Sequence, residues 1–433
     1  MKTHLKKTLT YILYILAKLV LRRYKPSIVG VTGNVGKTST KDAIFVAMSP
    51  HVHIRKSEKS FNSEIGVPLS VLGVPNAWNI PIKWAKNIFT GIFLIIFKHS
   101  YPKWLVLEIG ADAPGDIKSL SNWIKPDVVV ITRFPDVPVH VEFFESKEAV
   151  IEEKKYLVKA LKKDGVLVLN ADDPEVLKLS GESMQKVVTY GFTKDANVRV
   201  LSYDFIYQEI DKVKFPIGLE ATIAIGEKEY PMTLEGILGA HQLSSILAGI
   251  AVAYALSYDI EKTIEALKEF ETPPGRLSPI LGINNSLIID DSYNSSPVAV
   301  EASLSMLKKM KAKGKKIAVL GDMLELGKYT ADSHRDIGVS ASLSADIIIA
   351  VGIRSKMIHD SAFAHGFNKE HIYHVSDSVE ASEILKNIVA KGDIVLVKGS
   401  QGVRLEKAVK AIMRFPEEAK ERLVRQDPEW QRR

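Results

Sequence analysis

The sequence predicts an α/β protein in which a domain of the P-loop type is followed by a Rossmann-like domain, each built on a parallel sheet. Two observations support this prediction. A buried strand, a glycine-rich turn and a helix follow one another over residues 27–39, and apolar strands alternate with helical stretches on both sides of residues 273–275 (Pro-Pro-Gly), a plausible hinge. With 46% apolar and 25% charged residues among 433, the composition is that of an ordinary globular protein rather than a disordered one.

The cysteine count and the charge balance exclude several classes of protein. Because the chain has no Cys, a disulfide framework, a thiolate nucleophile, an iron–sulfur cluster and a sulfur-ligated zinc site are ruled out. The net charge of +7 is spread along the chain, whereas a nucleic-acid-binding protein more often shows a concentrated basic stripe. The charge therefore fits an anionic small substrate or an anionic membrane surface, and we expect no nucleic-acid partner.

The first predicted element is a helix whose apolar stretch, residues 9–21, lies between Lys6-Lys7 and Arg22-Arg23. It is too short to span a bilayer, it contains Lys18, and no signal-peptide cleavage site follows it. Two interpretations remain open. The helix lies in a membrane interface, or it docks on the protein's own surface.

A second uncharged stretch, residues 87–97, is flanked by Lys83, Lys86 and Lys98. It is also too short to cross a bilayer. We interpret it either as a buried helix or as a second membrane contact.

Residues 27–39 carry the most specific signal in the chain. An apolar strand over Ile28–Thr32 leads into a turn, and a helix begins near Lys37. Glycines let backbone N–H groups close around phosphate oxygens, and the helix N-terminus adds its positive end. Although Gly30 stands one position before the first glycine of the generic pattern, the order of elements predicts a nucleotide site, with Lys37 on the terminal phosphates and Thr38 on Mg²⁺. The predicted nucleotide-binding residues are Gly33, Asn34, Val35, Gly36, Lys37, Thr38 and Ser39.

Two later strands end near side chains that suit a metal site. Residues 105–108 form an apolar strand that ends in Glu108, and a strand over 127–131 leads towards His140. The carboxyl ends of parallel strands lie along one edge of a sheet, where such sheets bind ligands. Glu108 and His140 are therefore candidate Mg²⁺ ligands, although Glu108 alone is equally consistent with a solvated strand end and His140 alone with an ordinary loop residue.

With these residues identified, the chain resembles the Mur ligases, ATP-dependent enzymes that join an amino acid or peptide to a carboxylate during peptidoglycan assembly. The resemblance runs over residues 27–413. Residues 290–294 (Asp-Asp-Ser-Tyr-Asn) and 321–327 (Gly-Asp-Met-Leu-Glu-Leu-Gly) are specific to the branch that adds D-alanyl-D-alanine. Other matching stretches are Phe61–Pro68, Asn170–Pro174, Gly239–Gln242, Gly275-Arg276 and Lys398–Ser400.

The resemblance implies roles for the first set of residues. Lys37 and Thr38 would hold the ATP phosphates and a first Mg²⁺, and Glu108 and His140 would complete the metal sites. Lys154 matches the lysine that is carbamylated in this family and helps to place a second Mg²⁺. Spacing alone favours a surface lysine at position 154, and the adjacent Lys155 is the other lysine that the family position could match. The catalytic candidates are thus Lys37, Glu108, His140 and Lys154, and the metal ligands are Thr38, Glu108, His140 and Lys154.

A second set of implied residues lies near and beyond the hinge. Arg276 and Asp291 match nucleotide contacts that form when the C-terminal domain closes, and Asn294 lies in the same loop. Gln242 stands where the family has an Asn that contacts adenine. His334 and Lys398 lie in family-like stretches, but no chemical role is assigned to them.

The expected domains are a basic apolar helix over residues 1–27, a central ATP-binding domain over 28–275 and a C-terminal domain over 276–433. Other family members carry a UDP-gripping domain before the phosphate loop, whereas here 29 residues precede Gly30. We therefore expect that domain to be absent, with the basic helix in its place. Further predictions are a small side sheet of short strands over 198–232, C-terminal-domain strands near 287–290, 316–320, 346–351 and 394–397, and a solvated charged end over 417–433.

The resemblance implies an ATP- and Mg²⁺-dependent amide ligase of cell-wall synthesis. Its partners would be a muramoyl-peptide acceptor and D-Ala-D-Ala or a similar amine, joined through an acyl phosphate without a protein nucleophile. We expect a cytoplasmic monomer, with contact between residues 1–25 and the inner face of the membrane as a further hypothesis. The alternatives are a Mur-like ligase for a lipid-linked or archaeal wall-peptide acceptor, and an inactive ATP-binding scaffold.

Overall fold

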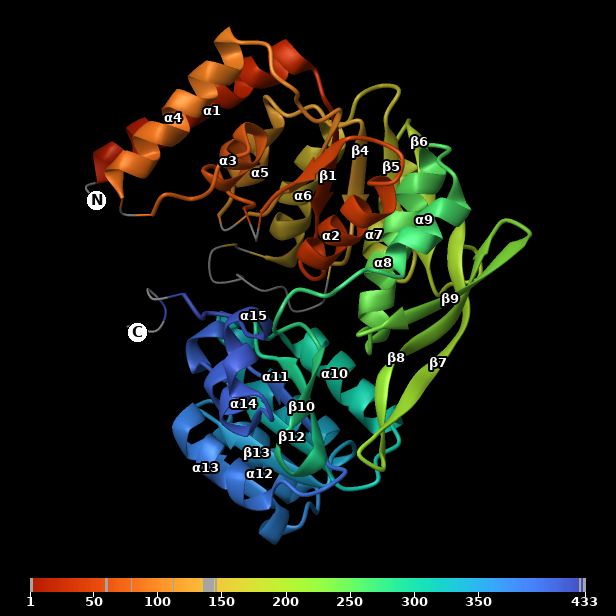
Figure 1. Cartoon of the computed structure of the whole chain (residues 1–433), viewed down its shortest axis with the longest axis vertical. Helices are drawn as coiled ribbons and strands as arrows, with labels where there is room; N and C mark the ends of the chain where they lie inside the picture. The colour runs from red at the N-terminus through yellow and green to blue at the C-terminus, as the bar shows by residue number, and fades with distance from the viewer. Residues whose placement is uncertain are drawn as a thin grey trace. The chain divides into compact units, whose positions relative to one another are not determined.

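The computed structural model describes residues 3–58, 61–78, 80–111, 113–134, 144, 146–427 and 430. It contains two compact units (Figure 1). The N-terminal unit comprises Met1–Leu201, Ile223–Tyr230 and Ser244–Phe270, and the C-terminal unit comprises Ser202–Thr222, Pro231–Leu243 and Glu271–Arg433. The functional boundaries expected at residues 28 and 276 remain predictions.

The N-terminal unit is built on a parallel sheet in which β1 (Ser27–Thr32) pairs with β3 (Trp104–Glu108) on one side and with β4 (Val128–Ile131) on the other. These strands are almost continuously apolar and buried, as expected when helices cover both faces of a sheet. The strands predicted here, and a helix beginning at Lys37, are confirmed. The sheet is completed by β2 (Ile54–Lys56) beyond β3 and by β5 (Val166–Asn170) and β6 (Lys186–Gly191) beyond β4.

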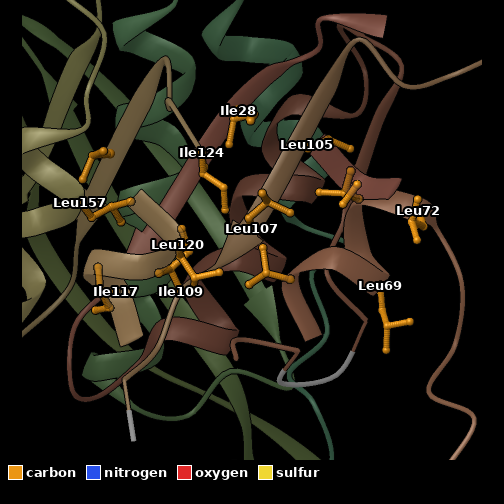
Figure 2. Close-up of a cluster of buried hydrophobic side chains, with 14 of the residues drawn as sticks. Ile28, Leu69, Leu72, Leu105, Leu107, Ile109, Ile117, Leu120, Ile124 and Leu157 are labelled. Atoms are coloured by element: carbon orange, nitrogen blue, oxygen red, sulfur yellow. The ribbon is translucent and has the colours of Figure 1, made fainter. Parts of the chain in front are cut away.

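The apolar side chains of six helices of this unit form one core with the sheet. Figure 2 shows Leu105 and Leu107 of β3 in one cluster with Leu69, Leu72, Ile117, Leu120 and Leu157. The helices are α1 (Thr3–Tyr24), α2 (Lys37–Met48), α3 (Gly66–Leu72), α4 (Pro81–Ile96), α5 (Asp116–Ser121), α6 (Lys147–Lys159), α7 (Pro174–Leu177), α8 (Ala240–Ala255), whose first four residues belong to the C-terminal unit, and α9 (Ile260–Leu267).

The strands predicted as a small side sheet over 198–232 differ from that expectation. β7 (Val198–Ile210) and β8 (Val213–Ile225) are 13 residues each, and β9 (Lys228–Glu235) follows. They extend the sheet order as β6-β7-β8-β9 rather than forming a sheet of their own. Two-residue turns join them, and Asp211-Lys212 adopts positive φ as such tight turns require. In a strand with one solvated face, polar residues alternate with apolar ones, so the sequence contains no long apolar run. For this reason the pattern suggested short strands.

Helix α1 is part of the core of the N-terminal unit. Its buried residues recur at helical spacing and face α3 and α4, against which α1 packs (Figure 1). A Cβ on Gly91 of α4 would lie 3.0 Å from Leu16 Cδ1, so α1 and α4 approach closely at this glycine. The interpretation that the first helix docks on the protein's own surface is therefore confirmed for its apolar face, which comprises Leu9, Leu13, Leu16, Ala17 and Val20.

Helix α4 has two different faces. Trp84, Asn87, Gly91 and Leu94 are buried, whereas the opposite face exposes large apolar side chains. The prediction of a buried helix over residues 87–97 thus holds for one face only. Within the described residues, no helix has both the length and the apolar content to cross a bilayer.

The C-terminal unit contains a second sheet with the order β10-β11-β15-β12-β13-β14, in which only the β10–β11 pair is antiparallel. The four strands predicted from sequence are confirmed. The strands are β10 (Ser278–Gly282), β11 (Ser286–Asp291), β12 (Lys316–Gly321), β13 (Ile347–Val351), β14 (Ile372–Val375) and β15 (Ile394–Lys398). The helices are α10 (Pro297–Lys309), α11 (Thr330–Ser342), α12 (Lys356–Ala364), α13 (Ser378–Ile388), α14 (Glu406–Ile412) and α15 (Ala419–Arg422).

The prediction of a solvated C-terminal end is wrong for the part around Arg425. The buried guanidinium of Arg425 donates to Glu406 Oε2 at 3.1 Å and to the Ser292 carbonyl at 3.1 Å. Glu406 is itself buried and also accepts from Arg404. A buried carboxylate needs cationic partners, and the chain end supplies one of them.

The fold makes a stability prediction about α1. Replacing the fully buried Leu13 by Ala is expected to lower the free energy of unfolding by about 2–5 kcal/mol, because a cavity would open under the helix. Leu19→Ala, on the exposed side of the same helix, is expected to change it by no more than about 0.5 kcal/mol. Denaturant unfolding of both variants measures the difference, and equal effects would contradict the packing of α1.

Candidate functional site

The site in the N-terminal unit starts at the carboxyl end of β1, where the chain turns into α2. The end of β4 holds this turn in place. The Asn34 backbone N–H donates to the Arg133 carbonyl at 2.8 Å, and Thr132 Oγ1 donates to the Val35 carbonyl at 2.7 Å. Residues 33–36 are therefore fixed between two neighbouring strand ends before any ligand binds.

Two glycines make the turn possible. Gly33 has φ 144°, and a Cβ there would lie 2.0 Å from Thr132 Oγ1. Gly36, with φ 84°, precedes α2, and no side chain caps that helix. The N–H groups of the first turn and the positive end of the helix dipole favour a phosphate at this position. Ser39 is buried in the same turn.

Lys37 and Thr38 point in different directions, Lys37 towards the phosphate loop and Thr38 towards Glu108. Lys37 Nζ donates to the carbonyls of Gly33 at 3.0 Å and Asn34 at 3.2 Å, so its charge lies over the loop. Thr38 Oγ1 donates to Glu108 Oε2 at 2.9 Å. The register of β1 and β3, which pairs Val31 with Glu108, brings the two side chains together.

Glu108 is only 1% exposed, and both of its oxygens are hydrogen-bonded. Besides Thr38, the Asn62 amide donates to Oε1 at 3.2 Å. A hydroxyl and a carboxylate are the oxygen ligands that Mg²⁺ prefers, so this pair fits the predicted metal site. Of the other two proposed ligands, His140 lies outside the described residues, and Lys154 belongs to α6. Among the described residues there is no cluster of three or more His, Asp and Glu side chains that would form a ready-made cation site.

Lys154 of α6 lies in the interior next to the phosphate loop. Burial and, to a smaller extent, the positive charge of Lys37 lower its pKa to about 7, while Glu153 opposes the shift. Near neutral pH a large fraction of this amine is therefore unprotonated and able to act as a nucleophile. Lys155 contrasts with it, because its ammonium pairs with Glu152 at 2.9 Å and Glu182 at 3.0 Å, which raises its pKa.

Glu153, the neighbour of Lys154, fixes the orientation of α6. Its carboxylate accepts from the backbone N–H groups of Gly115 at 2.9 Å, Ile117 at 2.7 Å and Lys118 at 3.0 Å, at the start of α5. A buried carboxylate satisfied in this way is a rigid anchor. Glu153 was not predicted from the sequence, since a Glu next to two lysines in a helix is typical of a solvated face.

Lys41 is a second residue that the sequence analysis missed. It lies one turn after Lys37 in α2, is fully buried and donates to the Ser57 carbonyl at 2.8 Å. Burial lowers its pKa, and the neighbouring Asp42 and the charge of Glu108 oppose the shift. Ser57 in turn donates through Oγ to the Val106 carbonyl and accepts from the Glu108 backbone N–H at 3.3 Å. The sequence signal that could have identified Lys41 is its spacing of four residues from Lys37, which places both on the same side of the helix.

The C-terminal unit holds a second group of predicted residues. Asp291 ends β11 opposite Lys398 at the end of β15, and the register pairs them. Lys398 Nζ lies 2.7 Å from Asp291 Oδ2 and donates to the Asn294 carbonyl at 3.1 Å. Ser303 Oγ also donates to Asp291, at 2.8 Å. Lys398, to which no role was assigned, thus holds the loop of Asp291 and Asn294.

Gln242 and Arg276 are neighbours within the same unit. The Gln242 carbonyl oxygen accepts from the backbone N–H groups of Leu238 at 3.0 Å and Gly239 at 2.8 Å, and its amide donates to the Arg276 carbonyl at 2.9 Å. The Arg276 guanidinium lies over the Tyr293 ring, 4.3 Å from its centroid. In this structure the amide of Gln242 therefore binds backbone groups and fixes the position of Arg276.

His334 has a structural environment. Its Nε2 accepts from the Met323 backbone N–H at 3.0 Å, and its Nδ1 donates to the Thr330 carbonyl at 2.6 Å. Burial lowers its pKa, in agreement with a neutral ring. It holds the 321–327 loop in shape.

The predicted residues thus form two groups, one in each unit. The N-terminal unit brings together the phosphate loop, Glu108 and Lys154, and the C-terminal unit brings together Gln242 with Arg276 and Asp291 with Asn294. The first group offers phosphate binding, a divalent cation site and a reactive amine.

Comparison with known proteins agrees with this arrangement. The family model for the Mur ligase middle domain matches residues 31–253, and that for the Mur ligase glutamate ligase domain matches residues 275–401. The UDP-N-acetylmuramoyl-tripeptide–D-alanyl-D-alanine ligase of Bacillus subtilis is 30% identical over 403 residues, which is 93% of this chain and 79% of that protein. The enzyme of the same name from Escherichia coli is 25% identical and covers 92% of this chain and 79% of its own length. The solved structure of a MurF ligase from Thermotoga maritima in complex with ADP superposes with a TM-score of 0.75 at 26% identity, covering 95% of this chain and 84% of that one.

The buried amine predicts a pH-dependent stability. In the unfolded chain Lys154 keeps its proton up to the ordinary pKa of 10.5, whereas in the folded chain it releases it near 7. The unfolded state therefore binds more protons between these values, and the cost of burying Lys154 is largest below pH 7 and fades as the pH rises. Lys154→Met is expected to raise Tm at pH 6, by roughly 2–4 °C for each kcal/mol recovered, and less at pH 9.

Thermal unfolding in metal-free buffer purged of CO₂ checks this, with Lys155→Met as the matched control. The control removes the two ion pairs of Lys155 and is expected to give no gain at either pH. A gain in Tm that is the same at both pH values would contradict the low pKa of Lys154.

Proposed function

This chain belongs to the Mur ligase family, and we propose that it is the ATP-dependent ligase that adds D-alanyl-D-alanine to the carboxylate of a muramoyl tripeptide in peptidoglycan synthesis. The observation that supports this most strongly is the grouping of a phosphate loop, the Thr38–Glu108 pair and the low-pKa Lys154 in one unit. An inactive scaffold would have no need of a buried lysine beside a phosphate loop.

The reaction must turn an unreactive carboxylate into an electrophile. The γ-phosphoryl group of ATP moves to the acceptor carboxylate and gives an acyl phosphate and ADP; the amine then attacks the acyl carbon, and phosphate leaves. In this scheme residues 33–36 and the start of α2 bind the phosphates, and Lys37 offsets the charge on the group in transfer. The protein contributes positioning and electrostatics, and it supplies no nucleophile to the substrate.

Mg²⁺ would be held by Thr38, Glu108, His140 and, as its carbamate, Lys154. When bound, it supplies positive charge that neutralises the phosphate oxygens. Carbamylation joins the unprotonated Lys154 amine to CO₂ and releases one proton, which converts a cationic side chain into an anionic metal ligand. The low pKa of Lys154 supports this proposal, because only the neutral amine reacts.

The residues of the C-terminal unit are proposed to bind the nucleotide when the two domains close. Arg276, Asp291 and Asn294 are held in place by Gln242, Tyr293 and Lys398. Gln242 contributes by fixing the turn at residues 238–239 and the backbone of Arg276. A direct contact between its amide and adenine would require exchange of these hydrogen bonds.

Lys37→Ala is expected to lower amine-dependent phosphate release from ATP by at least about 10²–10³-fold, because an electrostatic contact to the transferring group is lost. The surface variant Lys163→Ala is the control and is expected to keep wild-type turnover. Assays should offer UDP-linked and lipid-linked muramoyl tripeptides side by side, with mass spectrometry to detect D-Ala-D-Ala addition. Phosphate release that needs no amine, or no product with any acceptor, would contradict the proposal.

We also propose that the N-terminal unit contacts an anionic membrane surface through α4 and the basic end of α1. The face of α4 opposite its buried side exposes Ile82 by 82%, Phe89 by 69% and Ile96 by 61%. Their spacing places them on one side of the helix, and Phe93 and Phe97 extend the same apolar patch. Large aromatic side chains at an exposed helix face are typical of helices that lie in a membrane interface.

Charge specifies the kind of surface that fits this patch. Residues 3–25 and 81–103 contain no Asp or Glu. Lys83 and Lys86 lie among the exposed apolar residues, and the Arg23 guanidinium reaches the Ile96 carbonyl at 3.5 Å. An apolar patch ringed by cations complements anionic lipid headgroups. Because ATP is available inside the cell, the surface contacted would be the inner face of the membrane.

Phe89→Asp is expected to weaken binding to vesicles of phosphatidylglycerol and phosphatidylcholine by roughly tenfold or more, since one buried aromatic is worth about 1.5–3 kcal/mol. Ile353→Asp is the matched control, because Ile353 is 88% exposed in the C-terminal unit. Cosedimentation measures both variants. Absence of wild-type binding to anionic vesicles, or equal binding by Phe89→Asp and wild type, would contradict the membrane proposal.

A further inference from the structure

A cavity of about 550 Å³ lies among α1, α3 and α5 in the N-terminal unit. We infer that it binds the sugar of the acceptor, an inference that rests on the proposed function. Its volume falls within the range of small-molecule sites. No predicted site residue lines it, and among its lining residues are Lys7, Tyr11, Tyr14, Glu64, Asn122 and Trp123.

Aromatic rings form one wall of this cavity. Tyr14 meets Trp123 edge to face, with ring centroids 5.5 Å apart, and Tyr11 lies next to Tyr14 at 6.1 Å. Lys18 donates to the Tyr14 hydroxyl at 3.2 Å and fixes that ring. Tyr11 is 63% exposed, so a flat aromatic surface faces incoming ligand. Rigid rings with apolar faces and polar edges suit the C–H faces of a pyranose.

The polar lining suits the substituents of such a sugar. Glu64 accepts hydrogen bonds from hydroxyl or amide N–H groups, and the Asn122 amide both donates and accepts, as an acetamido group requires. Lys7 adds a positive charge at the rim for a carboxylate or phosphate attached to the ring. The mixture of three rings with a few convergent polar groups is typical of a ligand site rather than of a packing defect.

Two segments of the chain connect the cavity to the phosphate loop. Glu64 lies two residues after Asn62, whose amide donates to Glu108, and two residues span no more than about 7 Å. The other segment is α5, whose first turn is bound by Glu153, next to Lys154, while Asn122 and Trp123 follow its last turn. A sugar held here would place its peptide near Glu108, where the carboxylate must be phosphorylated.

Helix α1 is essential to this cavity, because it supplies Lys7, Thr10, Tyr11 and Tyr14. The same helix turns its apolar face to the core through Leu9 and Leu13. One element therefore forms part of the fold on one side and a ligand-binding wall on the other. The sugar is shared by acceptors whose diphosphate carries a nucleoside and by those whose diphosphate carries a polyprenyl chain, so the cavity would serve either source.

Isothermal titration of the full chain with N-acetylmuramoyl tripeptide tests this inference, with the UDP-linked and polyprenyl-diphosphate-linked forms as parallel arms. Tyr11→Ala is expected to weaken binding about tenfold in every arm, because a stacking surface is lost. Ser119→Trp, which fills the cavity from α5, is expected to weaken it at least as much. The control Tyr254→Ala removes another exposed tyrosine ring of the unit and is expected to leave acceptor binding unchanged. All three variants are expected to bind ATP as the wild type does.

The outcomes separate this inference from the proposed function. In turnover assays, Tyr11→Ala is expected to raise KM for the acceptor about tenfold and to leave kcat unchanged, since it removes binding common to ground and transition states. Unchanged acceptor affinity in both Tyr11→Ala and Ser119→Trp, or no binding of the muramoyl tripeptide by the wild type, overturns the sugar site even if ligation proceeds. Weakened binding in a chain that ligates no acceptor supports the sugar site and counts against the ligase.

Discussion

The hydrogen bond between Thr38 Oγ1 and Glu108 Oε2 is the contact on which the site depends. It joins the first turn of α2 to the end of β3, and it exists because β1 and β3 are parallel neighbours whose carboxyl ends meet at one edge of the sheet. Asn62 holds the other carboxylate oxygen, so Glu108 is fixed from two sides. The phosphate loop and the proposed cation site therefore meet at this buried carboxylate.

A second constraint is the burial of Lys154 beside Lys37. Loss of hydration in the interior disfavours the ammonium form of Lys154, and the nearby positive charge of Lys37 adds repulsion, so the pKa of Lys154 is lowered. The helix cannot turn the lysine away, because Glu153 is tied to three backbone N–H groups of α5. Burial of Lys154 therefore costs stability, at a position where a neutral amine is chemically useful. Such shifted pKa values are common at functional sites.

The helices α1 and α4 show how one pair of elements can serve several purposes. The apolar stripe of α1 packs inward, and its aromatic residues border the sugar cavity. Helix α4 packs closely on α1 at Gly91, and its opposite face exposes large apolar residues. If both proposals hold, an acceptor attached to a lipid could reach the cavity while the unit rests on the membrane.

The sequence by itself determined the strand–turn–helix order at residues 27–39 and the C-terminal strands, and it indicated the residues proposed to bind phosphate, because these depend on local periodicity and on glycine conformations. It could not decide between Lys154 and Lys155, or find Glu153 and Lys41, because burial depends on which elements pack together. The same holds for the apolar stretches of α1 and α4, since hydrophobicity alone does not say whether a face meets the core or the solvent. Tertiary packing determines which face is buried. It also produces the low pKa of Lys154, the two hydrogen bonds to the carboxylate of Glu108 and the cavity beside α1.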